Sequence, residues 1–139
     1  MPKPVPQAGV VAVRAGRVCL TTSRSGQRWV IPKGHIDPGQ TPANAAAAEA
    51  WEEAGLTGDL DPAPLGDFEY EKLARSYRVT VYLLPDPAEA SDYPEAGERT
   101  RAWLAPEEAA ARVREPGLRD LIRLAAARAG LTAGARPLE

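Results

Sequence analysis

The chain has 139 residues, 44% of them hydrophobic and 26% charged, and its formal net charge at pH 7 is -2. A chain of this length buries one hydrophobic core and is too short for two ordinary domains, so we expect a single domain over residues 1–139. The weak net charge argues against a nucleic-acid-binding protein, and no apolar run approaches the ~20 residues of a membrane helix. We therefore expect no nucleic-acid partner and no membrane partner.

The start of the chain and its cysteine content favour a cytoplasmic location. Residues 1–9, MPKPVPQAG, lack the apolar segment of a signal peptide, and the single cysteine, Cys19, cannot form an internal disulfide. Cys19 lies in the apolar, strand-like segment RVCLTT. We expect it to be a small buried hydrophobic residue rather than a catalytic thiol.

The first part of the chain is typical of β-strands. Residues 8–22 are rich in β-branched and apolar residues and are interrupted at Ala15-Gly16, which predicts a β-hairpin. Residues 28–31 predict a third short strand, which ends at Pro32.

A turn and a helix follow. Pro38-Gly39 suits the two central positions of a type II turn. Thr41 suits the N-cap and Pro42 the first position of a helix. Gly55 suits the left-handed residue just past a helix end, so the pattern predicts one helix from Pro42 to the residue before Gly55.

The remaining elements complete a mixed α/β domain, in which a sheet lies between helices. We expect strands over residues 65–72, 77–84 and 100–104, and helices over residues 105–113 and 118–130. The polar, proline-containing ends over residues 1–6 and 132–139 are expected to be disordered.

The predicted helix carries three clustered carboxylates. Glu49, Glu52 and Glu53 lie within five residues of one another in AAAAEAWEEAGL. At ~100° per residue they gather on one side, and the other side carries small alanines with Trp51 as the one large anchor. The alanine side is expected to pack closely against a sheet.

No basic residue near the cluster in sequence offsets its charge, because no Lys or Arg occurs from Gly34 through Glu71. Like charges at these spacings cost an isolated helix about 0.2–0.5 kcal/mol per pair, and carboxylates in the last turn oppose the helix dipole. Clustered hard oxygen ligands suit Mg²⁺, with Mn²⁺ as an alternative, and such ions commonly bridge carboxylates to phosphate oxygens. The competing interpretation is an ordinary solvated helix face.

The flanking segments favour the metal interpretation. In the preceding loop, PKGHIDPGQ, Gly34 can let the backbone approach a ligand and Lys33 can meet an anion. Other basic residues also flank the acidic segment: Arg24, Arg28, Lys72, Arg75, Arg78, Arg99 and Arg101. An acidic centre with a basic rim suits a polyphosphate.

These residues resemble the Nudix box, G-x5-E-x7-R-E-U-x-E-E-x-G-U, in which U is apolar. Gly34, five residues, Gln40, seven residues and then AEAWEEAGL follow that spacing. The resemblance to the Nudix hydrolase family implies an α/β/α sandwich and metal-dependent hydrolysis of a diphosphate linked to another moiety. It places Glu49, Glu52 and Glu53 on the metal-ligand positions.

Two positions depart from the box. Gln40 stands where the family has Glu, and Ala48 stands where it has Arg. In the family that arginine is thought to help orient the glutamates, so we expect reduced or retuned activity. The alternative from a different class is an inactive domain that senses a nucleotide or an inositol phosphate.

The resemblance also suggests a catalytic base. The candidates are Glu52 and Glu53 on the helix, and Glu95 and Glu98 in the later loop SDYPEAGER, because family members often recruit an acid from that region. We take Glu52, Glu53 and Glu98 as the catalytic set.

The surrounding segments are similar to the branch that contains diphosphoinositol polyphosphate and diadenosine polyphosphate hydrolases. That similarity implies phosphate contacts from Arg24, from Arg78 and from one of Arg99 or Arg101, with Arg101 taken here, in addition to Lys33 and Gly34 in the glycine loop. A pyrophosphatase for nucleoside triphosphates or nucleotide sugars is the alternative. The expected partner is a phosphorylated small molecule, and both a monomer and a homodimer are compatible with the sequence.

Overall fold

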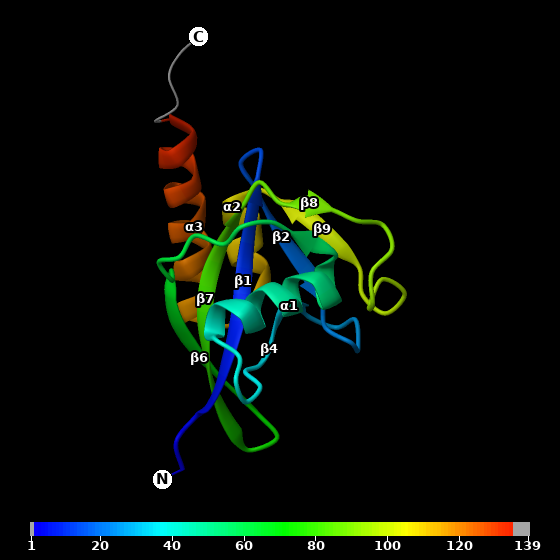
Figure 1. The fold of residues 1–139 in the computed structure, drawn as a ribbon, viewed down its shortest axis with the longest axis vertical. Helices are drawn as coiled ribbons and strands as arrows, with labels where there is room; N and C mark the ends of the chain where they lie inside the picture. Colours follow the sequence, from blue (N-terminus) through cyan, green and yellow to red (C-terminus); the bar gives the residue numbers. More distant parts are fainter. Residues whose placement is uncertain (1, 135–139) are drawn as a thin grey trace.

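The computed structural model describes residues 2–134. They form a main sheet that is covered by helices on both faces (Figure 1). The strands are β1 (Val5–Arg14), β2 (Arg17–Thr22), β3 (Trp29–Val30), β4 (Lys33–His35), β5 (Leu56–Thr57), β6 (Gly66–Lys72), β7 (Arg75–Pro85), β8 (Ala88–Glu89) and β9 (Arg101–Leu104). The helices are α1 (Pro42–Ala54), α2 (Pro106–Arg112) and α3 (Pro116–Gly134). No helix in this part of the chain is both long and apolar enough to cross a membrane.

The main sheet is mixed and is built around β1. Its order is β3-β2-β1-β7-β6, with β4 added beside β1 and β9 beside β2, and β5 and β8 form a separate pair. β1 and β7 run parallel, whereas β2 and β4 are antiparallel to β1. On one side of β1, the pairing strand is β2 near the end of β1 and β4 near its start. This pairing brings the segment around Gly34 into the sheet.

Two hydrophobic clusters lie on the two faces of the sheet. The residues of β1 alternate between them, because successive side chains of a strand point to opposite faces. Val11 and Val13 join the cluster under α2 and α3, and Ala8, Val10 and Ala12 join the cluster under α1. The result is the α/β/α sandwich that the sequence predicts.

The local signals in the sequence are largely confirmed. Ala15 and Gly16 both have positive φ, at 50° and 75°, as a tight hairpin between β1 and β2 requires. Thr41 caps α1 by accepting a hydrogen bond from the Asn44 amide at 3.1 Å, and Gly55 ends the helix at φ 66°. Cys19 is buried, as expected.

Three expectations about the secondary structure were wrong. Residues 33–35, expected as loop, form β4, because the backbone of β1 is available to pair with them. Of the start of the chain that was expected to be disordered, Val5 and Pro6 are ordered, since they pair with the long strand β7. The Ala-rich helix α3 continues to Gly134, so only residues 135–139 of the predicted disordered end lie outside the described part.

The buried face of α1 also differs from the prediction. Ala45, Ala46, Ala50 and Ala54 are buried, whereas Trp51 is 37% exposed and anchors nothing in the core. At ~100° per residue, Trp51 lies on the side of α1 away from the face that these alanines and Glu53 define, so its ring points away from the sheet.

Candidate active site

The loop before α1 is fixed by a turn in which Gln40 takes part. The Gln40 amide donates to the Asp37 carbonyl at 3.0 Å, and the Gln40 side-chain oxygen accepts from the Asp37 amide at 2.9 Å. Gly39 has φ 85°, as the predicted type II turn requires. The neutral amide of Gln40 therefore makes a backbone contact that a carboxylate oxygen would also make.

The three glutamates of α1 differ in burial. Glu53 is 8% exposed, Glu49 is partly buried and Glu52 is exposed. They lie beside the buried face of the helix, whereas the sequence pattern predicts them on the side away from it. This placement directs Glu49 and Glu53 toward β4 and leaves Glu52 in solvent.

Gly34 makes room for one of these carboxylates. A Cβ atom at Gly34 would overlap the carboxylate atoms of Glu49. The sequence suggested that Gly34 lets the backbone approach a ligand. In the structure, the carboxylate of Glu49 fills the space that a side chain at residue 34 would need.

Glu53 has a basic partner, contrary to the expectation drawn from the sequence. Its Oε1 accepts from the backbone amide of Lys33 at 3.3 Å, and its Oε2 lies 3.7 Å from Nη2 of Arg99. Arg99 also donates from Nε to Glu95 Oε1 at 2.7 Å and from Nη1 to the Thr22 carbonyl at 3.0 Å. The sequence did not reveal this ion pair, because Arg99 lies just before β9 and is distant from Glu53 along the chain.

The remaining negative charge is poorly compensated. Burial, followed by the charges of Glu53, Glu52 and Glu95, raises the pKa of Glu49 to about 7. Burial also raises the pKa of Glu53, against the opposing effect of Arg99. Among residues 2–131, the side chains of Glu49 and Glu52 form no hydrogen bond and no ion pair.

The residue types at this site fit a divalent metal ion, although no closed coordination group is assembled. Within the described residues, no three His, Cys, Asp or Glu side chains converge as a ready-made metal site. The donors are nevertheless hard carboxylate oxygens, which suit Mg²⁺ and Mn²⁺. Burial, and after it repulsion from the neighbouring glutamates, raises the pKa of Glu49, and a bound cation would offset both effects. Glu49, Glu52 and Glu53 are therefore the residues that would hold such an ion.

The acidic residues open into a basic pocket of ≈ 510 Å³. Its charged lining residues are Arg24, Arg28, Lys33, Glu49, Glu53, Lys72 and Arg99. A second pocket of ≈ 620 Å³ shares Arg24, Arg28 and Lys72 with it and adds Arg114. Five basic side chains thus face two carboxylates in the first pocket, an arrangement suited to an anion with several phosphates.

Tyr70 lines this pocket and is held by contacts with two other residues. The Tyr70 hydroxyl donates to Gln7 Oε1 at 2.6 Å, and its ring stacks on Tyr77 at 5.0 Å. The ammonium of Lys33 lies 4.7 Å from the Tyr70 ring centroid. Burial lowers the pKa of Lys33. Nothing in the sequence pattern marked Gln7 or Tyr70, because their contact joins β1 to β6.

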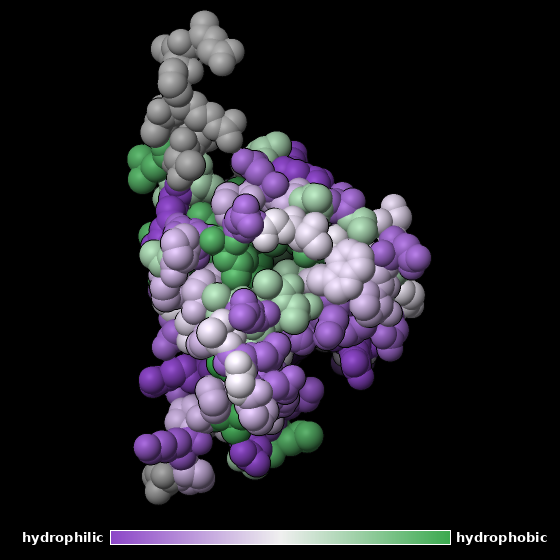
Figure 2. All heavy atoms as spheres, viewed as in Figure 1, coloured by the Kyte–Doolittle hydropathy of each residue, from purple (hydrophilic) through white to green (hydrophobic). Residues whose placement is uncertain are grey.

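A separate hollow lies between α1 and the segment that follows it. Figure 2 shows apolar surface there amid mostly hydrophilic surface, and a pocket of ≈ 110 Å³ is lined by Ala47, Ala50, Leu56, Leu60 and Leu84 together with Thr57 and Gly58. Its lining contains no charged side chain, in contrast to the basic pocket.

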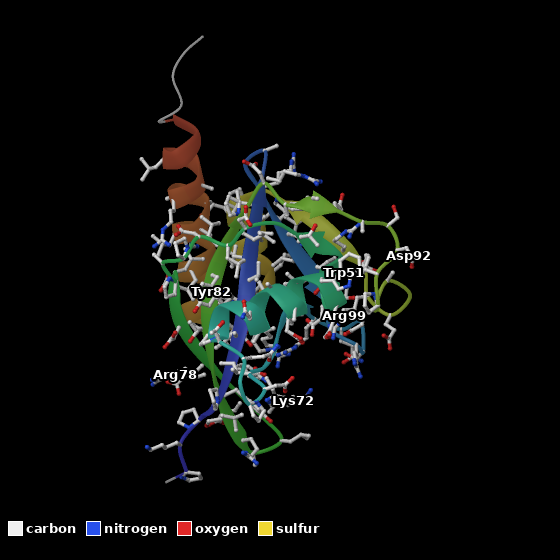
Figure 3. The ribbon with its side chains drawn as sticks, in the orientation of Figure 1. Trp51, Lys72, Arg78, Tyr82, Asp92 and Arg99 are labelled. Carbon is white, nitrogen blue, oxygen red and sulfur yellow. The ribbon has the colours of Figure 1, made fainter. Side chains whose placement is uncertain are left out.

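Two arginines expected at the site lie elsewhere. Arg78 does not line the pocket and pairs with Glu69 at 3.6 Å, on the opposite side of the strand from Tyr77. Figure 3 shows Arg78 well away from Arg99, which lies beside α1. Arg101 donates from Nη1 to the carbonyls of Ala54 and Ala90, at 2.6 and 2.9 Å, so it closes the end of α1. Of the alternatives Arg99 and Arg101, the pocket contains Arg99.

The later loop also differs from expectation. Glu98 is exposed and, like Glu52, lies outside the pocket lining, but unlike Glu52 it is not among the carboxylates whose charges act on Glu49, so its position supports a role as base less well. Glu95 is held near the site by Arg99 and lies 3.9 Å from Arg24. The sequence pointed to both glutamates but could not rank them, because the loop has no local pattern that fixes its path.

The fold and the site define an α/β/α domain in which an acidic helix faces a basic pocket. A model of the NUDIX domain matches residues 3–125, and the chain belongs to the Nudix family.

Known relatives agree with this assignment. The chain is 33% identical over 114 residues to "Nudix hydrolase 16, mitochondrial" of Arabidopsis thaliana, covering 76% of this chain and 63% of that protein. It is 35% identical over 92 residues to "Diphosphoinositol polyphosphate phosphohydrolase 3-beta" of Bos taurus, covering 65% and 55%. It therefore spans between half and two thirds of the length of these relatives. The crystal structure of C. elegans Ap4A hydrolase matches with a TM-score of 0.69 at 26% identity, covering 90% of this chain and 98% of that one.

Proposed function

We propose that this protein is a metal-dependent hydrolase that cleaves a phosphoanhydride bond by attack of water at phosphorus. The observation that carries the proposal is the shared pocket, in which Glu49 and Glu53 face Arg24, Arg28, Lys33 and Lys72. A site with both signs of charge suits a metal-bound polyphosphate, whereas a purely structural domain has no use for it.

The helix carboxylates are the proposed metal ligands. Mg²⁺, or Mn²⁺, bound by Glu49, Glu52 and Glu53 would neutralise phosphate charge and acidify a bound water. Glu53 is already held by the Lys33 amide and Arg99. Glu49 and Glu52 are not held by other side chains among residues 2–131, so they can adjust to the ion and the substrate.

The basic residues bind and orient the substrate. Arg24, Arg28 and Lys72 border both pockets, so they can contact phosphates on either side of the scissile bond. Lys33 points its ammonium along the Tyr70 ring inside the pocket. Positioning of this kind supplies much of the rate enhancement in phosphoryl transfer.

Glu52 is the proposed base. Both oxygens of Glu53 face protein groups, whereas the exposed carboxylate of Glu52 has no such partner in the described residues. A carboxylate has two oxygens, so Glu52 could hold the ion through one and accept a proton from the attacking water through the other.

Diadenosine polyphosphates and diphosphoinositol polyphosphates are the proposed substrates. Each carries several phosphates, as the number of basic side chains in the two pockets suggests. The names of the bovine and C. elegans relatives are consistent with these two classes. Nucleoside triphosphates and nucleotide sugars are the alternative substrates.

The test is release of phosphate or nucleotide from a panel of these compounds, in Mg²⁺, in Mn²⁺ and in EDTA. We expect turnover of the long polyphosphates that EDTA abolishes. Thermal stabilisation by a panel member without turnover in either metal would instead indicate a sensor.

A further inference from the structure

The guanidinium of Arg99 joins three separate segments of the chain. Nε donates to Glu95 at 2.7 Å, Nη1 donates to the Thr22 carbonyl at 3.0 Å, and Nη2 lies 3.7 Å from Glu53. The side chains of Arg99 and Glu53 are only 9% and 11% exposed. Because the guanidinium is planar and two of its nitrogens donate hydrogen bonds, its orientation is fixed, and Nη2 is held facing Glu53 at ion-pair distance.

These contacts hold Glu53 at both oxygens. Oε1 accepts from the Lys33 amide of β4, and Oε2 faces Arg99. The protein therefore fixes the carboxylate of Glu53 before any ligand binds, whereas Glu49 and Glu52 have no comparable restraint within residues 2–131.

The helix supplies no cation for this task. α1 contains no Lys or Arg, and Ala48 precedes Glu49. Across the described side chains, Arg99 is the one basic group within ion-pair distance of an α1 carboxylate. Its two hydrogen bonds tie it to β2 and to residue 95, so the rest of the fold sets its position.

We propose that Arg99 is a positioning residue that fixes the carboxylate of Glu53 for metal binding. This inference rests on the proposed function, since it concerns the same metal ligands. It assigns Arg99 a role through Glu53, distinct from the direct phosphate contact that a pocket arginine would otherwise make.

The test compares Arg99→Lys and Arg99→Ala with the wild-type protein. Lysine keeps the positive charge, but its compact ammonium cannot reproduce two hydrogen bonds and an ion pair arranged in one plane. Loss of groups that orient metal ligands typically costs about 10- to 100-fold in metal affinity or activity. We therefore expect both variants to lose about 10-fold or more in Mn²⁺ affinity, measured by titration without substrate, and in kcat, with KM changing less than about threefold.

Two controls make the result specific. Arg123→Ala removes an exposed arginine of α3 that pairs with Glu107, and it should leave Mn²⁺ affinity and kcat unchanged. In a Glu53→Gln background, Arg99→Lys should have little further effect, because residues that act through one another are not additive. If Arg99→Ala does not fold, as judged by thermal unfolding, Arg99→Lys and the double variant still decide the question.

Three outcomes would overturn the inference. A large rise in KM with unchanged kcat and Mn²⁺ affinity would make Arg99 a substrate contact. Full retention of function in Arg99→Lys would show that charge alone matters. Additive effects with Glu53→Gln would separate the two residues. Mn²⁺ binding reports on Arg99 even if no compound is hydrolysed, so failure of the proposed function is distinguishable from failure of this inference.

Discussion

A Cβ atom at Gly34 would occupy the space that the Glu49 carboxylate fills, so the carboxylate of α1 fits against β4 only because residue 34 is glycine. This contact links β4 to α1 at the proposed metal site. It explains in steric terms why the segment needs glycine where φ itself does not demand it.

Gly34→Ala should displace Glu49 or push β4 away from the helix. We expect Mg²⁺-dependent turnover to fall about 10- to 100-fold, as for other changes that misplace metal ligands. Overpacking should also lower the free energy of unfolding by about 1–3 kcal/mol. Steady-state kinetics and urea denaturation measure the two effects. Unchanged kinetics would mean that the exact position of Glu49 is not needed for turnover.

The stability of the metal-free protein should fall as pH rises through neutrality. The pKa of Glu49 is raised from 4.5 to about 7, so the folded protein binds this proton more tightly than the unfolded chain does. Its stabilising contribution is complete below pH 4.5 and is lost as pH rises through 7. Allowing for partial exposure, we expect a loss of about 1–2 kcal/mol.

The matched variant for this measurement is Glu49→Gln, which cannot titrate. In EDTA, unfolding of the wild-type protein should become easier relative to that of Glu49→Gln between about pH 5 and 7.5. Mg²⁺ should restore stability to the wild-type protein above about pH 7, because the ion requires the ionised carboxylate. Parallel pH profiles for the two proteins in EDTA would contradict the raised pKa.

Arg101 should matter for stability and not for substrate binding. Its guanidinium bonds to the carbonyls of Ala54 and Ala90 and pairs with Glu89 at 2.9 Å. Hydrogen bonds to charged groups contribute about 1.5–3 kcal/mol each, so Arg101→Met should destabilise the fold by about 2–4 kcal/mol. KM should stay near the wild-type value, whereas Arg24→Met should raise KM. A selective rise in KM for Arg101→Met would instead make this residue a phosphate contact, as the sequence suggested.

The turn between β6 and β7 carries backbone strain that substitution should relieve. Leu73 and Ala74 have φ of 52° and 62°, and Leu73 is 90% exposed. Left-handed conformations cost ordinary residues roughly 1–2 kcal/mol each, whereas Asn and Gly adopt them readily. Leu73→Asn combined with Ala74→Gly should therefore raise the free energy of unfolding by about 1–2 kcal/mol. Urea denaturation measures the change, and a loss of stability would show that this turn differs from the one described.

Features with local causes were predictable from the sequence. Thr41 and Gly55 bound α1 as expected, because capping depends on residues at the helix ends. The spacing from Gly34 to Glu53 was sufficient to identify the acidic helix and the family, because both are properties of one short continuous segment.

Features that depend on distant segments were not predictable. Trp51 is exposed because the sheet contacts the face of α1 that carries the alanines and Glu53, and an Ala-rich helix does not reveal from its sequence which face that is. The pairing of Glu53 with Arg99 requires the path of the loop before β9. The same path decides that Arg99 enters the pocket while Arg101 closes the helix end.

The most direct test of the central claim is Mg²⁺-dependent hydrolysis by the wild-type protein and Glu52→Gln, measured side by side on diadenosine and diphosphoinositol polyphosphates. Glu52 is exposed, so the substitution should change the free energy of unfolding by less than about 0.5 kcal/mol. We expect turnover by the wild-type protein that EDTA abolishes and that Glu52→Gln reduces by about 100-fold or more. Equal turnover by the two proteins, or turnover that persists in EDTA, would contradict the assignment of the acidic helix as the catalytic metal site.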